Sequence, residues 1–316
     1  MAVVLSYDPV GPKFSISADA VMPSITVSAT LSGVVVDPKT PPVYTWNAAL
    51  AFVGSVTPHG SGHNTSHRTI PAQTGPRNSF VIPFTEIRGG VLTVSVSVRV
   101  GANTLTAHSI GLTVVGTNPT PAAIKTKANA IGATKVRFRK QMRQESSLMQ
   151  FTTSGWPHYS SDNLGGVGLC QITNPAPSAD QTWDWKRNVD AGWALYREKE
   201  VIEQRFVTAT RTGTEFRQWV TDWNHSRLPA KPIPVTLPDY TAEQLELDTI
   251  RGFNGFANGL HEFRVHRGPA PRRLLVVTLA AGGQSGAAEW ERVPVNERGT
   301  SGDPHYVEHV EAQADF

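Results

Sequence analysis

A glutamate in a setting suited to acid catalysis stands at the end of a basic segment, where the run 144–147 reads QESS. A glycine-rich run, 166–172, follows it and reads GVGLCQI. A carboxylic acid delivers a proton near neutral pH only if its pKa is raised, and apolar surroundings raise it. Leu148, Met149 and Phe151 follow Glu145 closely. Apolar surroundings of this kind would raise the pKa of Glu145 and suit it to delivering a proton.

Two further runs come later in the chain. Residues 188–195 read NVDAGWAL and residues 252–256 read GFNGF, followed by YVE at 306–308. In this order the pieces resemble the lysozyme-like soluble lytic transglycosylases, which are related to goose-type lysozyme. That family carries a catalytic Glu-Ser, a Gly-Leu-Met-Gln turn, an Asn-Ile-x-x-Gly-x-x-Tyr-Leu helix, an Ala-Tyr-Asn-Ala-Gly run and a closing Tyr-Val. The resemblance covers the chain from Ala123 onward, with Cys170 in place of the family's methionine.

The resemblance implies a substrate and a role for each matching residue. The substrate would be peptidoglycan, cleaved at the β-1,4 bond between N-acetylmuramic acid and N-acetylglucosamine, with Glu145 as general acid and then base. Ser146 would orient the carboxylate or a substrate group, and Gln171 would contact the N-acetyl group or position a water. The other substrate-binding residues that it implies are Gly168, Leu169, Phe253, Asn254 and Tyr306. No cofactor and no metal is expected.

A second carboxylate would change the product. Lytic transglycosylases need one carboxylate, because the substrate's N-acetyl group assists and its 6-hydroxyl closes a 1,6-anhydro ring. Asp162 precedes the glycines of the second run, where goose-type enzymes carry an acidic residue. If Asp162 faces Glu145, it can activate a water and make the protein a muramidase. The alternative is that Asp162 and Asn163 form a turn, as such residues prefer.

Two other functions stay open at this point. Residues 305–309 read HYVEH, which matches the H-x-x-E-H pattern of a zinc peptidase with His305 and His309 as ligands. Against it, the chain leaves almost no room for a third ligand downstream. The other function is non-catalytic binding of the cell wall, for which an intact Glu145 would not be needed. Cys170, the one cysteine, has no implied histidine partner and is expected to be a small core residue.

The chain is expected to have two domains. Residues 25–32 and 92–100 alternate apolar and polar side chains, as strands with one buried face do. After Pro119 and Pro121 the pattern becomes helical, with helix formers at 135–147 and one apolar face at 188–199. The run 274–280 fits a strand or a helix, and helix is favoured by its context.

The predicted fold class is therefore multidomain. An N-terminal all-β immunoglobulin-like sandwich at 1–117, serving targeting or binding, is joined by a linker at 118–122 to a mainly α, lysozyme-like catalytic domain at 123–316. The immunoglobulin-like resemblance is one of architecture only, because the cysteine pair of that fold is missing.

Composition sets further limits. The 316 residues carry a formal charge of +3 and 17% charged residues, so the balance does not call for nucleic acid as a partner. No segment is apolar enough to span a bilayer, and the N-terminus lacks the pattern of a secretory signal peptide. We therefore expect action in the periplasm or cell wall after export by a dedicated secretion system, as an antibacterial effector, or release with phage. The expected partners are peptidoglycan strands, an immunity protein and a secretion or phage delivery component.

Overall fold

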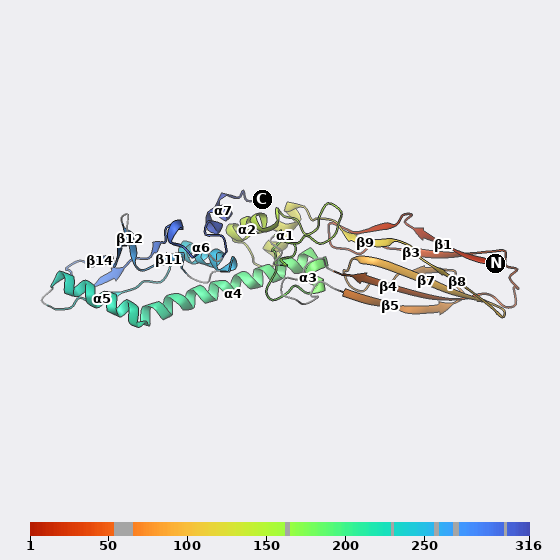
Figure 1. Cartoon of the computed structure of the whole chain (residues 1–316), viewed down its shortest axis with the longest axis horizontal. Helices are drawn as coiled ribbons and strands as arrows, with labels where there is room; N and C mark the ends of the chain where they lie inside the picture. The colour runs from red at the N-terminus through yellow and green to blue at the C-terminus, as the bar shows by residue number, and fades with distance from the viewer. Residues whose placement is uncertain (54–65, 162–164, 229–230, 256–258, 268–271, 300–301) are drawn as a thin grey trace. The chain divides into compact units, whose positions relative to one another are not determined.

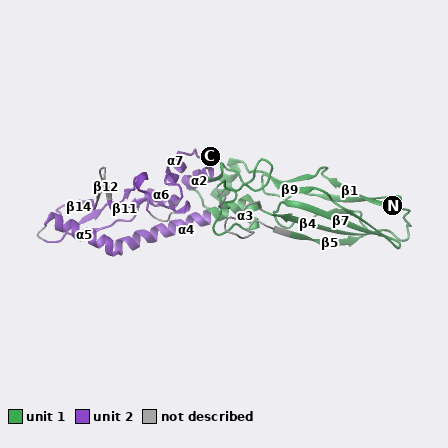
Figure 2. Cartoon of the chain, in the orientation of Figure 1, with its two compact units in different colours: residues 1–134, 145–192, 316 green, residues 135–144, 193–315 purple. Residues whose placement is uncertain are grey.

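The structure is a computed structural model that describes residues 1–53, 66–161, 165–228, 231–255, 259–267, 272–299 and 302–316 (Figure 1). The chain divides into two compact units (Figure 2). Unit 1 holds Met1–Thr134 with Glu145–Gly192 and Phe316, and unit 2 holds Lys135–Gln144 with Trp193–Asp315. The domain limits expected at residues 117 and 123 stay a prediction.

Two sheets form the strand-rich part of unit 1. The smaller sheet is antiparallel, and its strands in order are β1 (Ala2–Asp8), β3 (Thr26–Ser32) and β6 (Ser79–Val81). The larger sheet has the order β2 (Lys13–Ile16), β9 (Leu112–Gly116), β7 (Gly90–Val100), β4 (Val43–Phe52) and β5 (Ser66–Gly75), with β8 (Asn103–His108) also paired to β7. Strands β2 and β9 run parallel. The period-two alternation in β3 and β7 buries every second side chain, because successive residues of a strand point to opposite faces.

The core of unit 1 extends beyond the strands. Trp46 lies in it, 1% exposed and stacked on Phe80. Phe151 and Trp183 join the same apolar cluster, although both follow the helical start at residue 121. A Cβ added to Gly89 would lie 2.0 Å from the Trp183 ring, so this position has room only for glycine. The segment that carries the second sequence run is thus packed on the strand-rich part.

The expected linker at 118–122 is an ordered helix entry. Thr120 is the N-cap of α1 (Pro121–Ala130), where its side chain accepts a hydrogen bond from the backbone N–H of Ala123. Proline at the first helical position suits this start, because its missing N–H would have no intrahelical partner. The Asn118 Oδ1 accepts from the N–H groups of Gln150 and Phe151, both at 2.8 Å. This segment is therefore fixed to the chain that follows Glu145.

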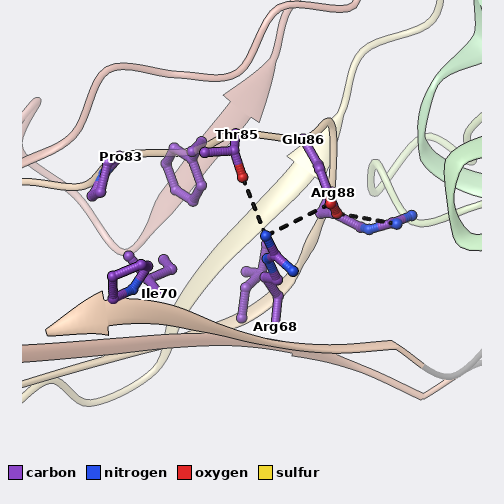
Figure 3. Close-up of a pocket in the computed structure, with 9 residues that line it drawn as sticks. Arg68, Ile70, Pro83, Thr85, Glu86 and Arg88 are labelled. Carbon is purple, nitrogen blue, oxygen red and sulfur yellow. Dashed lines mark hydrogen bonds and ion pairs between the residues drawn. The ribbon is translucent and has the colours of Figure 1, made fainter.

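An ion-pair cluster lies where the loop before β7 meets helix α3 (Ala179–Trp183). Glu86 lies between Arg68 and Arg88 and pairs with both, at 3.7 and 3.2 Å (Figure 3). Arg88 also pairs with Asp180 of α3 at 2.9 Å. The cluster lines a small hollow of the unit, and it adds an electrostatic tie between α3 and the strands to the packing of Trp183.

Unit 2 mixes helices with short strands, so the predicted mainly α second domain is wrong. Its helices are residues 136–144 of α2 (Val136–Ser146), residues 193–212 of α4 (Trp185–Thr212), α5 (Thr214–Arg227), α6 (Ala242–Phe253) and α7 (Tyr306–Ala312), with a 3₁₀ turn η1 (Val295–Glu297). Its strands are β10 (Val235–Thr236), β11 (His261–Glu262), β12 (Val265–Arg267), β13 (Arg272–Leu274), β14 (Val277–Leu279), β15 (Gly286–Ala288) and β16 (Glu291–Arg292). With 32% helix and 28% strand, the part of the chain that the structure describes belongs to a mixed α/β class.

The run 274–280 shows the physical reason for this correction. Its β-branched Val277 and Thr278 favour a strand. Val277–Leu279 pair antiparallel with Gly286–Ala288, and the turn between them contains glycines. Leu275 and Ala288 pack with Trp290 and Phe263 in the apolar core of unit 2. Cross-strand packing therefore decides against the helix expected at this place.

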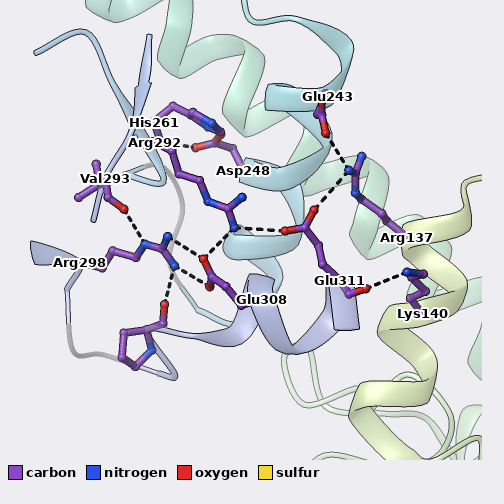
Figure 4. A network of polar contacts seen from close by, with 11 residues as sticks. Arg137, Lys140, Glu243, Asp248, His261, Arg292, Val293, Arg298, Glu308 and Glu311 are labelled. Carbon is purple, nitrogen blue, oxygen red and sulfur yellow. Dashed lines mark hydrogen bonds and ion pairs between the residues drawn. The ribbon is translucent and has the colours of Figure 1, made fainter. Parts of the chain in front are cut away.

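A charged network joins three helices of unit 2 (Figure 4). Arg137 of α2 pairs with Glu243 and Glu246 of α6, each at 3.0 Å, and with Glu311 of α7 at 3.4 Å. Lys140, one turn later on α2, donates to the carbonyl of Glu311 at 2.8 Å. Contacts of this kind on successive turns fix the rotation of α2 about its axis within the unit.

Across the part of the chain that the structure describes, no helix combines the length and the apolar character needed to cross a membrane.

Candidate functional site

Glu145 lies in the last turn of α2 and is half-buried. Leu148, Phe151 and Leu169 are buried in the same unit, and an apolar environment around Glu145 stays a prediction. The Glu145 charge lies close enough to Cys170 to act on its thiol, whose pKa is raised first by burial and further by that carboxylate. Glu145 and the glycine-rich run are therefore neighbours in space.

Ser146 makes the direct link between the first two runs. Its buried hydroxyl donates to the carbonyl of Leu169 at 3.0 Å. The hydroxyl is thus bound inside the protein, which suits a role in fixing the end of α2 against the turn. The role expected from the sequence, orienting the carboxylate or a substrate group, stays a prediction.

The glycine-rich turn needs glycine at residue 168. Gly168 has a φ of +73°, in the left-handed region that side chains rarely adopt. A Cβ there would lie 2.3 Å from Gln150 Oε1 and 2.7 Å from Asn188 Nδ2. The Gly168 N–H donates to the carbonyl of His158 at 2.9 Å. The turn is therefore held on one side by two buried amide side chains and on the other by the 157–159 segment.

Asn188 makes the third run part of the same assembly. Its side chain is fully buried, and its Oδ1 accepts from the Cys170 N–H at 2.9 Å. Its Nδ2 donates to the carbonyls of Val167 at 2.9 Å and Gln181 at 3.1 Å. Residue 188 lies in the first turns of α4, so this helix carries the side chain that closes the turn.

Gln150 is a site residue that the sequence analysis missed. It is fully buried, and its Oε1 accepts from the Leu169 N–H at 3.1 Å. Its Nε2 donates to the carbonyls of Gln181 and Thr182, at 3.1 and 2.9 Å. Nothing in the sequence marks this glutamine, because its partners come from segments that only the fold brings together.

Gln171 is used within the turn. It has a φ of +46°, and its Nε2 donates to the carbonyl of Gly168 at 2.9 Å. Its Oε1 is buried and has no hydrogen-bond partner among the described residues. Contact of Gln171 with a substrate N-acetyl group stays a prediction. Such a contact would use Oε1, or the hydrogen bond from Nε2 to the Gly168 carbonyl would have to break.

Cys170 is a protonated core thiol. It is 2% exposed, and the direction of its pKa shift keeps it in the neutral form. A thiolate nucleophile needs the opposite shift. Cys170 is therefore not suited to act as a nucleophile.

The remaining expected residues lie elsewhere in the chain. Asp162 falls outside the described residues. Phe253 ends α6 half-buried, and Asn254 caps that helix and donates from Nδ2 to the carbonyl of Asp303 at 3.2 Å. Tyr306 is buried at the start of α7, where its hydroxyl accepts from Gln141 Nε2 at 3.2 Å. These last three belong to unit 2, so their expected roles beside Glu145 stay predictions.

The H-x-x-E-H pattern has its own contacts in unit 2. Burial acts to raise the pKa of Glu308, but hydrogen bonds and charge from Arg298, with Arg292, hold it at about 2. So acidic a carboxylate is a poor general base. His309 bonds through Nδ1 to Asp303 Oδ2 at 2.7 Å. Within the described ranges, no group of three or more His, Cys, Asp or Glu side chains is placed to hold a metal ion. Glu308 thus acts as an anchor for two arginines.

No family model matches the chain, and no curated protein or solved structure matches it either.

Proposed function

We propose that this protein cleaves the β-1,4 bond between N-acetylmuramic acid and N-acetylglucosamine in peptidoglycan, as a lytic transglycosylase with Glu145 as its general acid. One observation carries the proposal. Three runs that resemble the transglycosylase motifs meet in unit 1, through the bond from Ser146 to Leu169 and the bonds of Asn188 to Val167 and Cys170. Three separate segments that matched the motifs by chance would not be expected to bond to one another at these residues.

The proposed chemistry needs one carboxyl group. Glu145 donates its proton to the glycosidic oxygen while the bond from the muramic acid C1 to that oxygen breaks, and the substrate's N-acetyl carbonyl stabilises the developing positive charge. The Glu145 carboxylate then takes the proton of the muramic acid 6-hydroxyl as this oxygen attacks C1. The products are a 1,6-anhydro-muramic acid end and a free 4-hydroxyl on N-acetylglucosamine, and Glu145 regains its proton.

The half-buried position of Glu145 suits this double role. Apolar surroundings would favour its protonated form, and its partial exposure leaves part of the side chain open to a ligand. The buried thiol of Cys170 on the other side stays neutral and adds no competing charge.

The first test compares Glu145→Gln with the parent on purified peptidoglycan. The amide cannot donate a proton in the same way, so wall digestion should fall by about 10²–10⁴-fold while the thermal unfolding midpoint stays close to that of the parent. Glu198→Gln is the control, because Glu198 is an exposed glutamate of α4. Equal digestion by Glu145→Gln and the parent would refute the proposal.

Mass spectrometry of the released fragments identifies the reaction. Muropeptides with 1,6-anhydro-muramic acid ends are the expected products. Reducing muramic acid ends would instead indicate a muramidase and give Asp162 a catalytic role. Absence of fragments from the parent protein would contradict cleavage and favour wall binding without catalysis.

The setting of the proposed reaction is the periplasm or cell wall. We propose delivery as an antibacterial effector by a dedicated secretion system, with an immunity protein in the producing cell, or release with phage. Protection of a producing strain by one co-expressed protein that binds this chain would distinguish the effector from the phage setting.

A further inference from the structure

An uncharged hollow opens on unit 1, at the end of β4 and the start of β7. Phe52, Val53 and Val91 line it from the strands, and Trp156, His158 and Tyr159 line it from the segment that follows Glu145. Its volume is about 1230 Å³ including the open mouth. Val53 and Val91 are 75% and 47% exposed, which leaves apolar surface in water at the rim.

The wall of this hollow is a rigid set of aromatic rings. Trp156 stacks on Phe52 with ring centroids 5.8 Å apart and planes 16° apart. Trp183, fully buried, meets both rings edge-on, at 5.0 Å from Phe52 and 6.1 Å from Trp156. Rings that are already fixed lose little conformational entropy when a ligand stacks on them. The wall therefore favours a ligand with flat apolar faces.

The polar groups of the hollow select against a charged ligand. Thr152 and Ser154 place hydroxyl groups at it, and they hydrogen-bond to each other at 2.8 Å. Burial lowers the pKa of His158, so its imidazole is neutral near pH 7. Among the described residues that line the hollow there is no Asp, Glu, Lys or Arg. A mostly apolar pocket with a few hydroxyl and imidazole groups suits a neutral, polyhydroxylated molecule.

The backbone of His158 links the wall of the hollow to the glycine-rich turn. The His158 N–H donates to the carbonyl of Gln150, and its carbonyl accepts from the Gly168 N–H, each at 2.9 Å. One residue thus places its side chain at the hollow and its backbone against the glycine-rich turn. A chain molecule bound near Glu145 has a second surface within the same unit.

From these features we infer that the hollow binds sugar units of a neutral β-1,4-linked N-acetylhexosamine chain, beyond the bond that is cut. This inference rests on the proposed function and extends it, since it gives the strand-rich part of unit 1 a share in holding the glycan. Apolar faces of the sugar rings would stack on Trp156, and their hydroxyls would meet Thr152, Ser154 and His158.

The test measures binding of the tetramer of β-1,4-linked N-acetylglucosamine to full-length Glu145→Gln, by calorimetry and by tryptophan fluorescence. Saturable binding is expected. Adding Trp156→Ala should raise the Kd by about tenfold, the order of effect of one aromatic contact. Adding Trp156→Phe should restore most of the affinity, because a planar ring remains.

A second pair of variants avoids the core. Val53→Arg places a long charged side chain at the mouth of the hollow, where the parent residue is 75% exposed, and should weaken binding at least as much as Trp156→Ala. Val35→Arg is its control, because Val35 is 96% exposed and does not line the hollow.

The outcomes separate the two proposals. Lack of tetramer binding, or equal binding by all variants, overturns the hollow as a glycan site even if the parent digests peptidoglycan. Normal binding with full digestion by Glu145→Gln overturns the catalytic proposal alone. Self-association that Val53→Arg abolishes, without tetramer binding, would assign the hollow to a second copy of the chain and overturn the inference.

Discussion

Removal of the Asn188 side chain tests whether the third run holds the turn beside Glu145. In Asn188→Ala, the Cys170 N–H loses its hydrogen bond to Oδ1 at 2.9 Å, and the carbonyls of Val167 and Gln181 lose the bonds from Nδ2. The Val167 carbonyl keeps the N–H of Ile172 at 3.2 Å, and the Gln181 carbonyl keeps Gln150 Nε2. The variant therefore leaves one buried donor unsatisfied and two acceptors with one bond fewer.

The magnitude follows from these three groups. A buried donor without a partner costs about 1–3 kcal/mol, and each lost second bond costs about 0.5–1.5 kcal/mol. Asn188→Ala should therefore lower the free energy of unfolding by about 2–6 kcal/mol. This is a large part of the total stability of a typical protein, which is about 5–15 kcal/mol.

Asn224 offers a matched control in unit 2. It is 8% exposed, its Oδ1 accepts from the Ile233 N–H at 2.7 Å, and its Nδ2 donates to the carbonyls of Val220 and Ile233 at 3.1 and 3.0 Å. Asn224→Ala removes the same three kinds of bond far from residues 166–172 in the sequence. A similar loss of stability is expected, without the loss of wall digestion expected of Asn188→Ala.

Urea unfolding followed by circular dichroism gives the stabilities, and digestion is assayed well below both midpoints. If Asn188→Ala costs less than about 1 kcal/mol, the bond accounting is wrong. If both variants lose digestion equally, the loss reflects general destabilisation, and Asn188 has no special place beside Glu145.

Two further perturbations test local features of the two units. Gly168→Ala should lower the free energy of unfolding by at least about 1–3 kcal/mol more than Gly101→Ala does. Both glycines have positive φ, but of the two only Gly168 would place a Cβ against buried side chains. Equal unfolding midpoints of the two variants would contradict this packing. Glu308→Gln should remove an acid-sensitive part of the stability: with its pKa lowered from 4.5 to about 2, Glu308 contributes fully above pH 4.5 and less as the pH falls toward 2. Glu243→Gln, 70% exposed, is the control, and urea midpoints of parent and variant that fall in parallel over this range would refute the role of Glu308.

The sequence pattern located strongly periodic elements well. Residues 25–32 and 92–100 alternate and correspond to β3 and β7, and helix formers at 135–147 correspond to α2. Such elements are readable because each has one face that must be buried. The described strands of unit 2 are two or three residues long, too short to display a period, and β10, β14 and β15 each place a side chain in the apolar cluster of Trp290.

The segment at 118–122 also holds a helix-start signal, because Thr120 before Pro121 is the pattern of an N-cap followed by a first helical residue. The residues around Glu145 also differ in whether a local sequence pattern marks them. Ser146 and Leu169 belong to recognisable motifs, whereas the Gln150 side chain binds residues of two segments that no local pattern connects.

The apolar core that Phe151 and Trp183 share with the strands of unit 1 determines whether the site can fold without those strands. A fragment of residues 123–316 would lack the strand partners of Phe151 and Trp183, which are 1% and 0% exposed in the full chain. It would also lack the carbonyl of Ala18, which accepts from Trp185 Nε1 at 2.9 Å.

Each aromatic side chain buries about 150–250 Å², worth about 4–6 kcal/mol at 25 cal/mol per Å². Half exposure of Phe151 and Trp183 would therefore cost about 4–6 kcal/mol together, which is comparable with the whole stability of many domains. We expect the full chain to unfold cooperatively and to digest peptidoglycan. The fragment should lack a cooperative unfolding transition and should digest no peptidoglycan. A fragment that unfolds cooperatively and is active would show that the glycine-rich turn keeps its shape without the strands. In that case the hydrogen bonds of Gln150 and Asn188, and not the shared aromatic core, would be sufficient to hold the turn beside Glu145.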